Sequence, residues 1–563
     1  MHVAFLSNPA SGEVNVQLAT AQELVSQGHR VTLLSGDSCS SKVDRLRKAQ
    51  HPRRHNLIHF IALGSARTVD DVTDFIQERM PLMRRAPGDP VSLETCLESA
   101  LGPAEEHAAT AVRVRDHLDA LDPDMICVDA LTPILITGVR LTGRKYILTV
   151  PCSPGMTALP GLFEPHCVAA NRDGSWGTLL ENIYLNMRCY IHSRTNPDRI
   201  AKASILTDCL KLKSYGTTAD TSNLPPHWED DNCVAGIHFN TLGLTDCPKQ
   251  SPKMIFVGAG LSPSAVNQHT PLSSSPEQTF LDTALLHNDD VVYMNMGSMF
   301  IWQRHEFFAC IEGFEAASQR HKALTGRGIR FLFKINFPLH STSTNQKDAK
   351  EPLLSKSELL SLPASILLTT WIPNQTAIYS HPALKAFIHH GGGNSFNEAV
   401  YFGVPQLVLS QWLDTHEYAN YAVKFGLGLK SERPPWIEKE DIEEKILCLV
   451  GERWGGFKRS CREWSVRCRV GGGVRAAARL VLGFAGADMN MDVDLEQVGD
   501  TGIDRVVDVN NARGGSLLTP PFSPVESEVE VEMECIESDD GKFKGETVSG
   551  KELKGLLITP LQT

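Results

Sequence analysis

Residues 385–398 read KAFIHHGGGNSFNE and form the most informative stretch of the sequence. The apolar run predicts a buried strand, the three glycines predict a turn, and the polar residues after them are compatible with a helix. Glycines let a backbone come close to an anion, and the first N–H groups of a helix carry a partial positive charge. The stretch therefore predicts a phosphate cradle, and a glycine-rich turn without a ligand is the alternative that it leaves open when taken alone.

Short apolar runs alternate with helix-like segments on both sides of this stretch. The runs lie at 3–6, 31–34, 125–128 and 145–150 in the first half, and at 291–294, 330–335, 366–368, 386–388 and 406–409 in the second. Such alternation is typical of parallel sheets covered by helices, so we expect an α/β fold built from doubly wound parallel-sheet domains. In the second half a small or polar residue follows each strand, and ligands bind at that edge of such sheets.

The length of 563 residues predicts two or three folding units, since single cores stop growing near about 250–300 residues. We place the first α/β domain at 1–245, an interdomain linker with one strand-like run at 246–276, and the second domain at 277–470. A helix at 471–487 is expected to return to the first domain. Residues 488–563 are acidic, poor in aromatics and without a period, which predicts a disordered tail.

Composition excludes several classes of protein. A formal net charge of -12 argues against a nucleic-acid partner, because proteins that bind nucleic acid carry a basic patch or stripe. The 14 cysteines form no CxxC pair and the first residues do not read as a secretory signal, so we expect free thiols in the cytosol. We find no stretch that approaches the roughly 20 uncharged apolar residues of a spanning helix, so we expect no integral membrane segment and leave peripheral membrane attachment open.

The segment from Trp371 to His416 resembles the donor signature of the family-one nucleotide-sugar glycosyltransferases, also called UDP-glycosyltransferases, in a form similar to fungal members. The matching residues are Trp371, Gln375, His381, Pro382, Phe387, His390, Gly392, Asn394, Ser395, Glu398, Gly403, Val404, Pro405 and Asp414. The resemblance is weaker over most of residues 1–487. It implies the GT-B fold, in which two Rossmann-like domains face a central cleft.

The resemblance also implies a role for each matching residue. The implied donor-binding set is Ser298, Trp371, Ile372, Gln375, His390, Gly392, Asn394, Ser395, Glu398, Asp414 and Thr415. Trp371 would stack on the uracil, Glu398 would accept the ribose hydroxyls, and Asp414 would bind hydroxyls of the sugar. The diphosphate would be held by Ser298, His390, Asn394 and Ser395. Taken alone, Trp371 would more often be a core residue and Glu398 more often a solvated helical residue. The donor site is favoured because the matching residues all lie at or just after strand ends.

The catalytic base is the main departure from the family pattern. The enzymes that this chain resembles use a histidine in the first loop, oriented by an aspartate. Glu13 falls where that histidine would stand, and Asp129 matches the aspartate. Burial and a like charge both raise a carboxylate pKa, which would suit Glu13 to act as a base near neutral pH. The alternative is that Glu13 is only a helix N-terminal residue favoured by the helix dipole.

Two further departures concern the donor. The family often ends its signature on Asp-Gln, whereas this chain has Asp414-Thr415-His416, and Gly393 stands where plant members carry tryptophan.

We expect an enzyme, a UDP-dependent hexosyltransferase of secondary metabolism. It would transfer a hexose, glucose by default, from a UDP-sugar to a hydroxyl of a small lipophilic acceptor, with inversion and without a metal or other cofactor. The alternative is a catalytically impaired UDP-sugar-binding protein. A nicotinamide-dependent oxidoreductase is disfavoured, because residues 7–15 lack the Gly-x-Gly-x-x-Gly turn.

Overall fold

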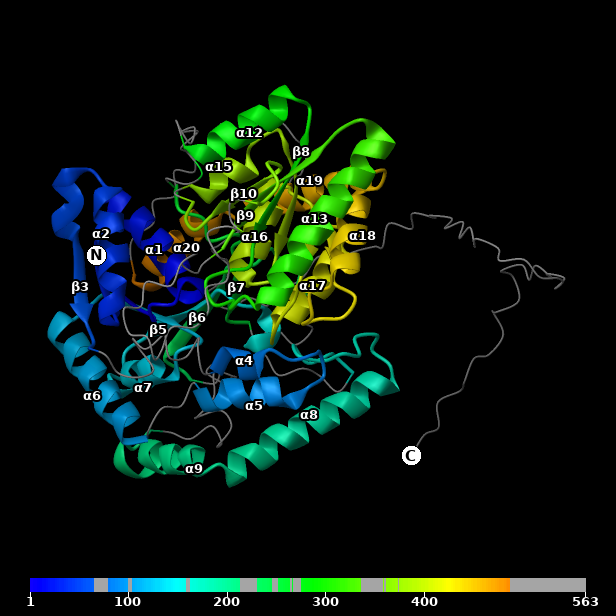
Figure 1. Ribbon diagram of the computed structural model, residues 1–563. Coiled ribbons are helices and arrows are strands. Elements are labelled where there is room, and N and C mark those ends of the chain that lie inside the picture. Colours follow the sequence, from blue (N-terminus) through cyan, green and yellow to red (C-terminus); the bar gives the residue numbers. More distant parts are fainter. Residues whose placement is uncertain are drawn as a thin grey trace, which may run out of the picture. The chain divides into compact units, whose positions relative to one another are not determined.

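The computed structural model describes residues 1–64, 79–99, 104–157, 163–212, 230–245, 252–263, 266, 275–335, 358, 361–372 and 374–486 (Figure 1). The tail predicted at 488–563 lies outside these residues. The described chain contains two parallel sheets with helices packed against them, which confirms the expected α/β class.

The first sheet has seven parallel strands in the order β3-β2-β1-β4-β5-β6-β7. These strands are β1 (His2–Leu6), β2 (Arg30–Ser35), β3 (Ile58–Ala62), β4 (Met125–Asp129), β5 (Tyr146–Val150), β6 (Cys233–His238) and β7 (Met254–Phe256). The helices of this half are α1 (Ser11–Ser26), α2 (Ser40–Lys48), α4 (Met80–Met83), α5 (Pro90–Ser99), α6 (Ala104–Leu121), α7 (Pro133–Leu141), α8 (Trp176–Thr195) and α9 (Pro197–Ser204). The order turns back between β1 and β4, which places the loops after both strands at a topological switch point.

The second sheet has six parallel strands in the order β10-β9-β8-β11-β12-β13. They are β8 (Asp290–Asn295), β9 (Ile329–Lys334), β10 (Ile366–Thr369), β11 (Leu384–His389), β12 (Gln406–Val408) and β13 (Gly428–Lys430). The helices that follow in this half are α12 (Pro276–Leu286), α13 (Arg304–Thr325), α15 (Gln375–Tyr379), α16 (Gly393–Phe402), α17 (Thr415–Lys424), α18 (Lys439–Val450) and α19 (Trp454–Val470). The switch point of this sheet lies between β8 and β11, directly before the three glycines.

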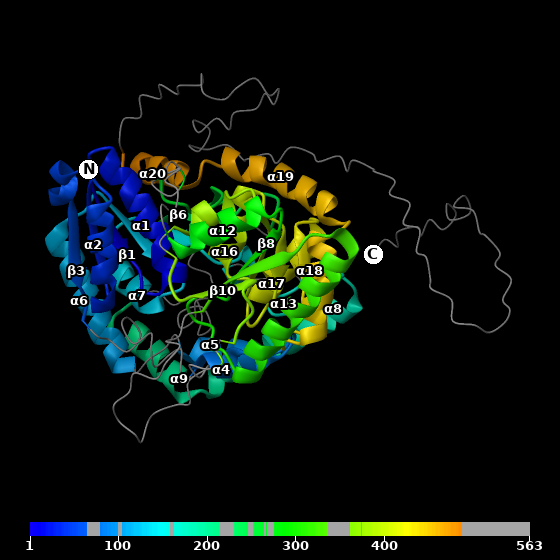
Figure 2. The same cartoon turned by 45° about the horizontal axis from the view of Figure 1, so that its top comes forward.

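The last described helix, α20 (Gly473–Phe484), packs against the first half rather than the second (Figure 2). Its buried face, which includes Val474, Ala478 and Val481, shares a core cluster with Val14 and Leu24 of α1. The run predicted inside the linker forms β7, which pairs with β6 at the edge of the first sheet. Both segments that flank the second half are therefore tied to the first half by packing or by strand pairing.

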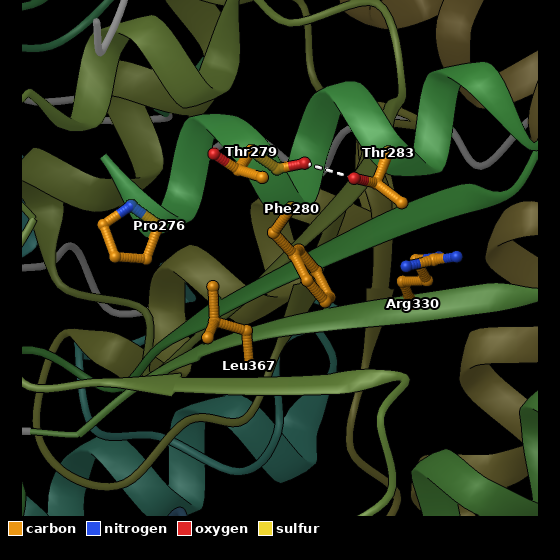
Figure 3. A pocket seen from close by; sticks show the side chains of 6 residues that line it. All are labelled: Pro276, Thr279, Phe280, Thr283, Arg330 and Leu367. Atoms are coloured by element: carbon orange, nitrogen blue, oxygen red, sulfur yellow. Dashed lines mark hydrogen bonds between the residues drawn. The ribbon is translucent and has the colours of Figure 1, made fainter. Parts of the chain in front are cut away.

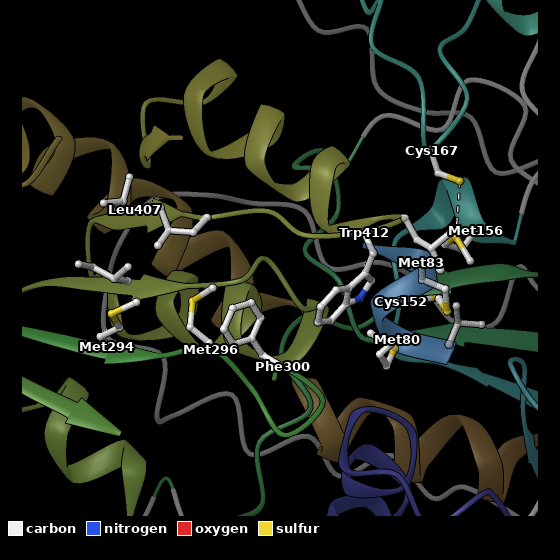
Figure 4. Packing of buried hydrophobic residues seen from close by; sticks show 14 of the residues in the cluster. Met80, Met83, Cys152, Met156, Cys167, Met294, Met296, Phe300, Leu407 and Trp412 are labelled. Atoms are coloured by element: carbon white, nitrogen blue, oxygen red, sulfur yellow. Dashed lines mark hydrogen bonds between the residues drawn. The ribbon is translucent and has the colours of Figure 1, made fainter. Parts of the chain in front are cut away.

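One hydrophobic cluster continues from the first half into the second (Figure 4). Met80 and Met156 of the first half belong to it together with Phe300 and Trp412 of the second. Methionine side chains adapt to irregular gaps, which suits a contact between two separately built cores. The halves are thus joined by apolar packing beside the edge where the candidate site lies.

A buried ion pair also joins the halves. Both terminal guanidinium nitrogens of Arg84 donate to the carboxylate of Glu306, at the start of α13, and one of them also donates to the carbonyl of Pro435 at 2.8 Å. Arg84 lies over the ring of Phe300 as well, with its guanidinium carbon 5.0 Å from the ring centroid. Removing one partner of such a pair leaves the other charge buried without compensation.

We expect Glu306→Ala to lower the free energy of unfolding by about 3 kcal/mol, because Arg84 would lose its buried carboxylate. The control is Glu443→Ala, which removes the partner of Arg320, a side chain that is 65% exposed. Exposed pairs contribute less than about 1 kcal/mol, so the control should change little. Urea denaturation of both variants is the measurement, and equal losses would contradict the inferred role of the Arg84–Glu306 pair.

Candidate active site

Trp371 follows β10 and presents its ring at the surface, where it is 58% exposed. Two cations lie near this ring: the Arg45 guanidinium carbon is 5.6 Å from the ring centroid, and the Lys334 amine is 5.7 Å from it. Arg45 comes from α2 of the first half and Lys334 from β9 of the second. Ile372, in contrast, is buried in the core of the second half, so only its backbone remains for contact with a ligand.

Glu398 on α16 is held by a hydrogen-bonded network that joins α15 to the end of β8. The Gln375 amide donates to Glu398 Oε2 at 2.8 Å and to the hydroxyl of Tyr379 at 2.7 Å. Gln375 Oε1 in turn accepts from Tyr293 and from Asn295, each at 3.0 Å. Burial raises the pKa of Glu398 to about 7, and the Gln375 bond opposes that rise. The network fixes the direction of one carboxyl group and uses Gln375 entirely for that purpose.

His390 lies at the end of β11, and glycines surround its ring. A Cβ at Gly297 would lie 2.4 Å from the imidazole Cε1, and one at Gly392 would lie 2.5 Å from Nε2. Burial lowers the pKa of His390 to about 4, so the imidazole is neutral at neutral pH. Its Nδ1 is buried and has no hydrogen-bond partner among the described residues. A neutral ring with an uncommitted nitrogen can donate to an anion without carrying charge.

The start of α16 lies against the first half of the chain. Gly392 is the residue directly before the helix, and Asn394 in its first turn donates from its side-chain amide to the Gly12 carbonyl at 3.0 Å. Ser395 follows in the same turn, and Ser298 is exposed in the loop after β8. The predicted phosphate residues therefore lie near one helix N-terminus, although the Asn394 amide already donates one hydrogen bond to the first turn of α1.

Asp414 and Thr415 at the start of α17 differ in what they can offer. Asp414 Oδ2 accepts from the backbone N–H of Ser153 in the first half at 3.1 Å, and burial raises the pKa of Asp414 to about 7. The Thr415 hydroxyl accepts from the backbone N–H groups of Gln411 and Trp412 and donates to the Trp412 carbonyl. The structure thus uses the Thr415 side chain to close its own turn rather than presenting it to a ligand.

Glu13, in the first turn of α1, and Asp129, the last residue of β4, lie close enough to interact electrostatically. Asp129 is fully buried, and its Oδ2 accepts from the Thr132 hydroxyl. Burial, followed by the charge of Glu13, raises the pKa of Asp129 to about 8. Burial also raises the pKa of Glu13. One oxygen of each carboxyl is buried without a hydrogen-bond partner in the described part of the chain. The pair therefore holds a proton at neutral pH.

Lys42 of α2 is the nearest cation that acts on this pair. Its amine donates to the Pro9 carbonyl at 2.5 Å and to the Ser11 hydroxyl at 3.1 Å, and its charge lowers the pKa of Glu13. It thereby fixes the start of α1, the helix that carries Glu13, and favours ionisation of Glu13 over that of Asp129. This role could not be predicted from the sequence, because Lys42 is one of several basic residues on α2 and its approach to Ser11 depends on the fold.

Glu417 is a buried carboxylate that sequence reasoning missed. It accepts from the Ser153 hydroxyl and the Tyr421 hydroxyl, and it pairs with Arg172 of the first half at 3.2 Å. Its charge also raises the pKa of Asp414. Glu417 lies three residues after Asp414 on the first turn of α17, and this spacing could have indicated it from the sequence.

A pocket of about 440 Å³ lies elsewhere on the second half, beneath α12 (Figure 3). Its lining comes from α12, β9 and β10, with Phe280, Arg330 and Leu367 among the side chains. None of the predicted site residues lines it.

In the described part of the chain, no group of three or more His, Cys, Asp or Glu side chains is placed to hold a metal ion. No helix among the described residues has the length and apolarity needed to cross a membrane.

Comparisons with known proteins agree with this architecture. Residues 351–458 match the family model described as Erythromycin biosynthesis protein CIII-like, C-terminal domain. A solved structure, the glycotransferase of kitacinnamycin, superposes with a TM-score of 0.56 at 18% identity, over 86% of this chain and 98% of that one. The fold is that of the GT-B glycosyltransferases.

Two fungal relatives are similar over most of the chain. Erythritol-mannosyl-transferase 1 of Mycosarcoma maydis and that of Pseudozyma antarctica are each 37% identical, over 85% of this chain and 91% of theirs. The chain therefore belongs to the family of GT-B glycosyltransferases that contains these enzymes and the UDP-glycosyltransferases, and it is a glycosyltransferase.

We expect Trp371→Ala to weaken binding of the donor nucleotide by roughly tenfold or more, because base–aromatic stacking contributes about 1–3 kcal/mol. Trp436→Ala is the matched control, since that tryptophan is 60% exposed and is not part of the site. Calorimetric titration with UDP and with GDP is the measurement. Equal affinity of the two variants for whichever nucleotide binds would remove Trp371 from the donor site.

Proposed function

We propose that this glycosyltransferase transfers a hexose from a nucleoside-diphosphate donor to a hydroxyl of a small acceptor, with inversion at the anomeric carbon. The observation that carries the proposal is the arrangement at the two facing switch points. Trp371, Glu398 and His390 offer a ring, a carboxyl and a neutral donor at one sheet edge, while Glu13 and Asp129 offer a paired base at the other. Asn394 connects the two edges through its bond to Gly12.

The donor end of the proposal rests on matching chemistry. The Glu398 carboxyl, held in place by Gln375, suits a pair of ribose hydroxyls. The open N-terminus of α16 and the His390 ring suit a diphosphate, because both supply N–H groups where negative charge is favoured. Trp371 suits the base. These groups support donor binding without an obligatory metal, which assay in the presence of a chelator would test.

The acceptor end rests on the carboxyl pair. Asp129, with a pKa of about 8, keeps its proton at neutral pH and leaves Glu13 as the carboxylate that Lys42 stabilises. Glu13 would take the proton of the acceptor hydroxyl as that oxygen attacks the anomeric carbon, and the nucleoside diphosphate would leave from the opposite face. Asp129 would then limit repulsion around Glu13 by remaining neutral, rather than stabilising a charged histidine.

A second combination of donor sugar and acceptor is also supported. The two relatives that match over most of their length are named erythritol-mannosyl-transferases, so mannose stands beside glucose as the donor sugar and a short sugar alcohol beside a lipophilic alcohol as the acceptor. Buried charged and hydroxyl groups next to Asp414, namely Glu417, Arg172 and Ser153, also favour a ligand rich in hydroxyls.

The test is a donor and acceptor matrix read by mass spectrometry. Purified protein would be incubated with UDP-glucose or GDP-mannose, each with erythritol or a phenolic alcohol, with and without a chelator. We expect a hexosylated product in at least one combination and retention of activity with the chelator. Nucleotide binding without product in every combination would instead support a catalytically impaired binding protein.

For the combination that reacts, we expect Glu13→Gln to lower kcat by about 10²–10⁴-fold, the usual contribution of a general base, while nucleotide affinity stays unchanged. The base must be ionised, and its pKa is raised by burial, so wild-type activity should fall as the pH falls through that raised pKa. Because Lys42 lowers the pKa of Glu13, Lys42→Met should move this acidic limb to higher pH, and Lys42→Arg should not. An unchanged profile in Lys42→Met, or full activity in Glu13→Gln, would rule out Glu13 as the base.

A further inference from the structure

The helix α8 carries an exposed apolar surface along its whole length. Trp176 is 72% exposed, Leu180 is 65% exposed and Tyr190 is 58% exposed, and Ile183, Tyr184 and Met187 between them are exposed as well. Their spacing of three or four residues places them on one stripe. Single exposed apolar residues are ordinary, whereas a continuous stripe of this kind marks an interaction surface.

The opposite side of α8 accounts for its attachment to the protein. Leu185 belongs to the main core cluster, and Cys189 packs against Leu93 of α5. Glu181, the one acidic residue of this fully described helix, accepts from the backbone N–H groups of Ala170 and Asn171. Figure 1 shows α8 extending beyond α5 at the periphery of the first half. The apolar stripe therefore faces away from the core and carries no acidic side chain.

Aromatic and basic side chains flank the stripe in the manner of a water–lipid boundary. The ring of Phe163, also exposed, meets Trp176 edge to face at 5.6 Å between centroids. At the other end, the Arg194 guanidinium carbon lies 5.4 Å from the centroid of Tyr190. Tryptophan and tyrosine favour the interface of a bilayer, and arginine there meets lipid phosphates. A stripe without acidic residues is notable in a chain with a net charge of -12.

The size of the stripe distinguishes a lipid surface from a second copy of the chain. A helix of 20 residues is about 30 Å long and about 10 Å wide, so two copies packed along it would bury roughly 600 Å². Specific dimers bury about 1,200–2,000 Å², so α8 alone falls well short. A bilayer accepts an amphipathic helix without needing a complementary shape. We propose that α8 docks this glycosyltransferase on the surface of a lipid bilayer, with its apolar stripe in the headgroup region.

The test is sedimentation of the full-length protein with vesicles of phosphatidylcholine and phosphatidylserine. We expect wild-type protein to sediment with the vesicles, and Leu180→Gln with Met187→Gln to lower the binding constant by about tenfold, because two large apolar side chains no longer enter the lipid. The control is Leu286→Gln with Leu324→Gln, two leucines on α12 and α13 that are 82% and 78% exposed. The control should bind as wild type does.

Three results would overturn the proposal: wild-type protein that stays in the supernatant, equal binding by the α8 variant and the control, or a wild-type dimer that the α8 variant abolishes in analytical ultracentrifugation. Circular dichroism and thermal unfolding of both variants would show that their folds are intact. The α8 residues lie outside the candidate active site, so nucleotide binding in solution should be the same in all three proteins. The outcome is thus independent of the proposed reaction.

Discussion

The turn from Gly391 to Gly393 imposes the constraint on which the site depends. A Cβ on Gly391 would lie 2.7 Å from the Thr415 carbonyl oxygen, and one on Gly393 would lie 2.4 Å from the Pro151 carbonyl oxygen. Gly391 also has φ of 90°, which side chains disfavour. Backbone from the end of β11, from the start of α17 and from the first half therefore meets at one point, and no side chain caps the N-terminus of α16. A tryptophan at position 393, as in plant relatives, would collide with the first half.

Burial of three carboxyl groups beside this turn sets the chemistry that is available. Asp129 and Asp414 have pKa values of about 8 and about 7, and the charge of Glu13 contributes to both shifts. Three such groups cannot all be ionised at neutral pH, because each desolvated charge raises the pKa of its neighbours. Lys42 makes these groups unequal, because its charge lowers the pKa of Glu13. Under the proposed function, a neutral Asp129 beside an ionised Glu13 would take the place of the histidine and aspartate of the family pattern.

The sequence predicted most strands but not all of them, for physical reasons. Continuous apolar runs such as those of β4 and β11 indicate strands buried on both faces, and both were found. The strand β3 contains a histidine, β6 contains a glycine and β13 has three residues, so their local signals are weak, and pairing with neighbours decides their conformation. In the candidate site, the positions of Trp371 and Glu398 follow from the resemblance to the family signature, whereas the approach of Arg45 and Lys334 to Trp371 could not be predicted. Their approach to Trp371 depends on how α2 and β9 are placed by the whole fold.

The two residues after Asp414, where the chain departs from the family signature, make hydrogen bonds within the protein. The Thr415 hydroxyl is committed to its own turn, and the His416 ring bonds to the Ser410 hydroxyl and the Arg85 carbonyl. Both side chains are therefore engaged within the protein at the position where the family signature often has glutamine. Asp414 remains, and it is held by Ser153 of the first half. Under the proposed function, a sugar bound at Asp414 would lie beside Ser153 of the first half, so the same few residues would influence the choice of both sugar and acceptor.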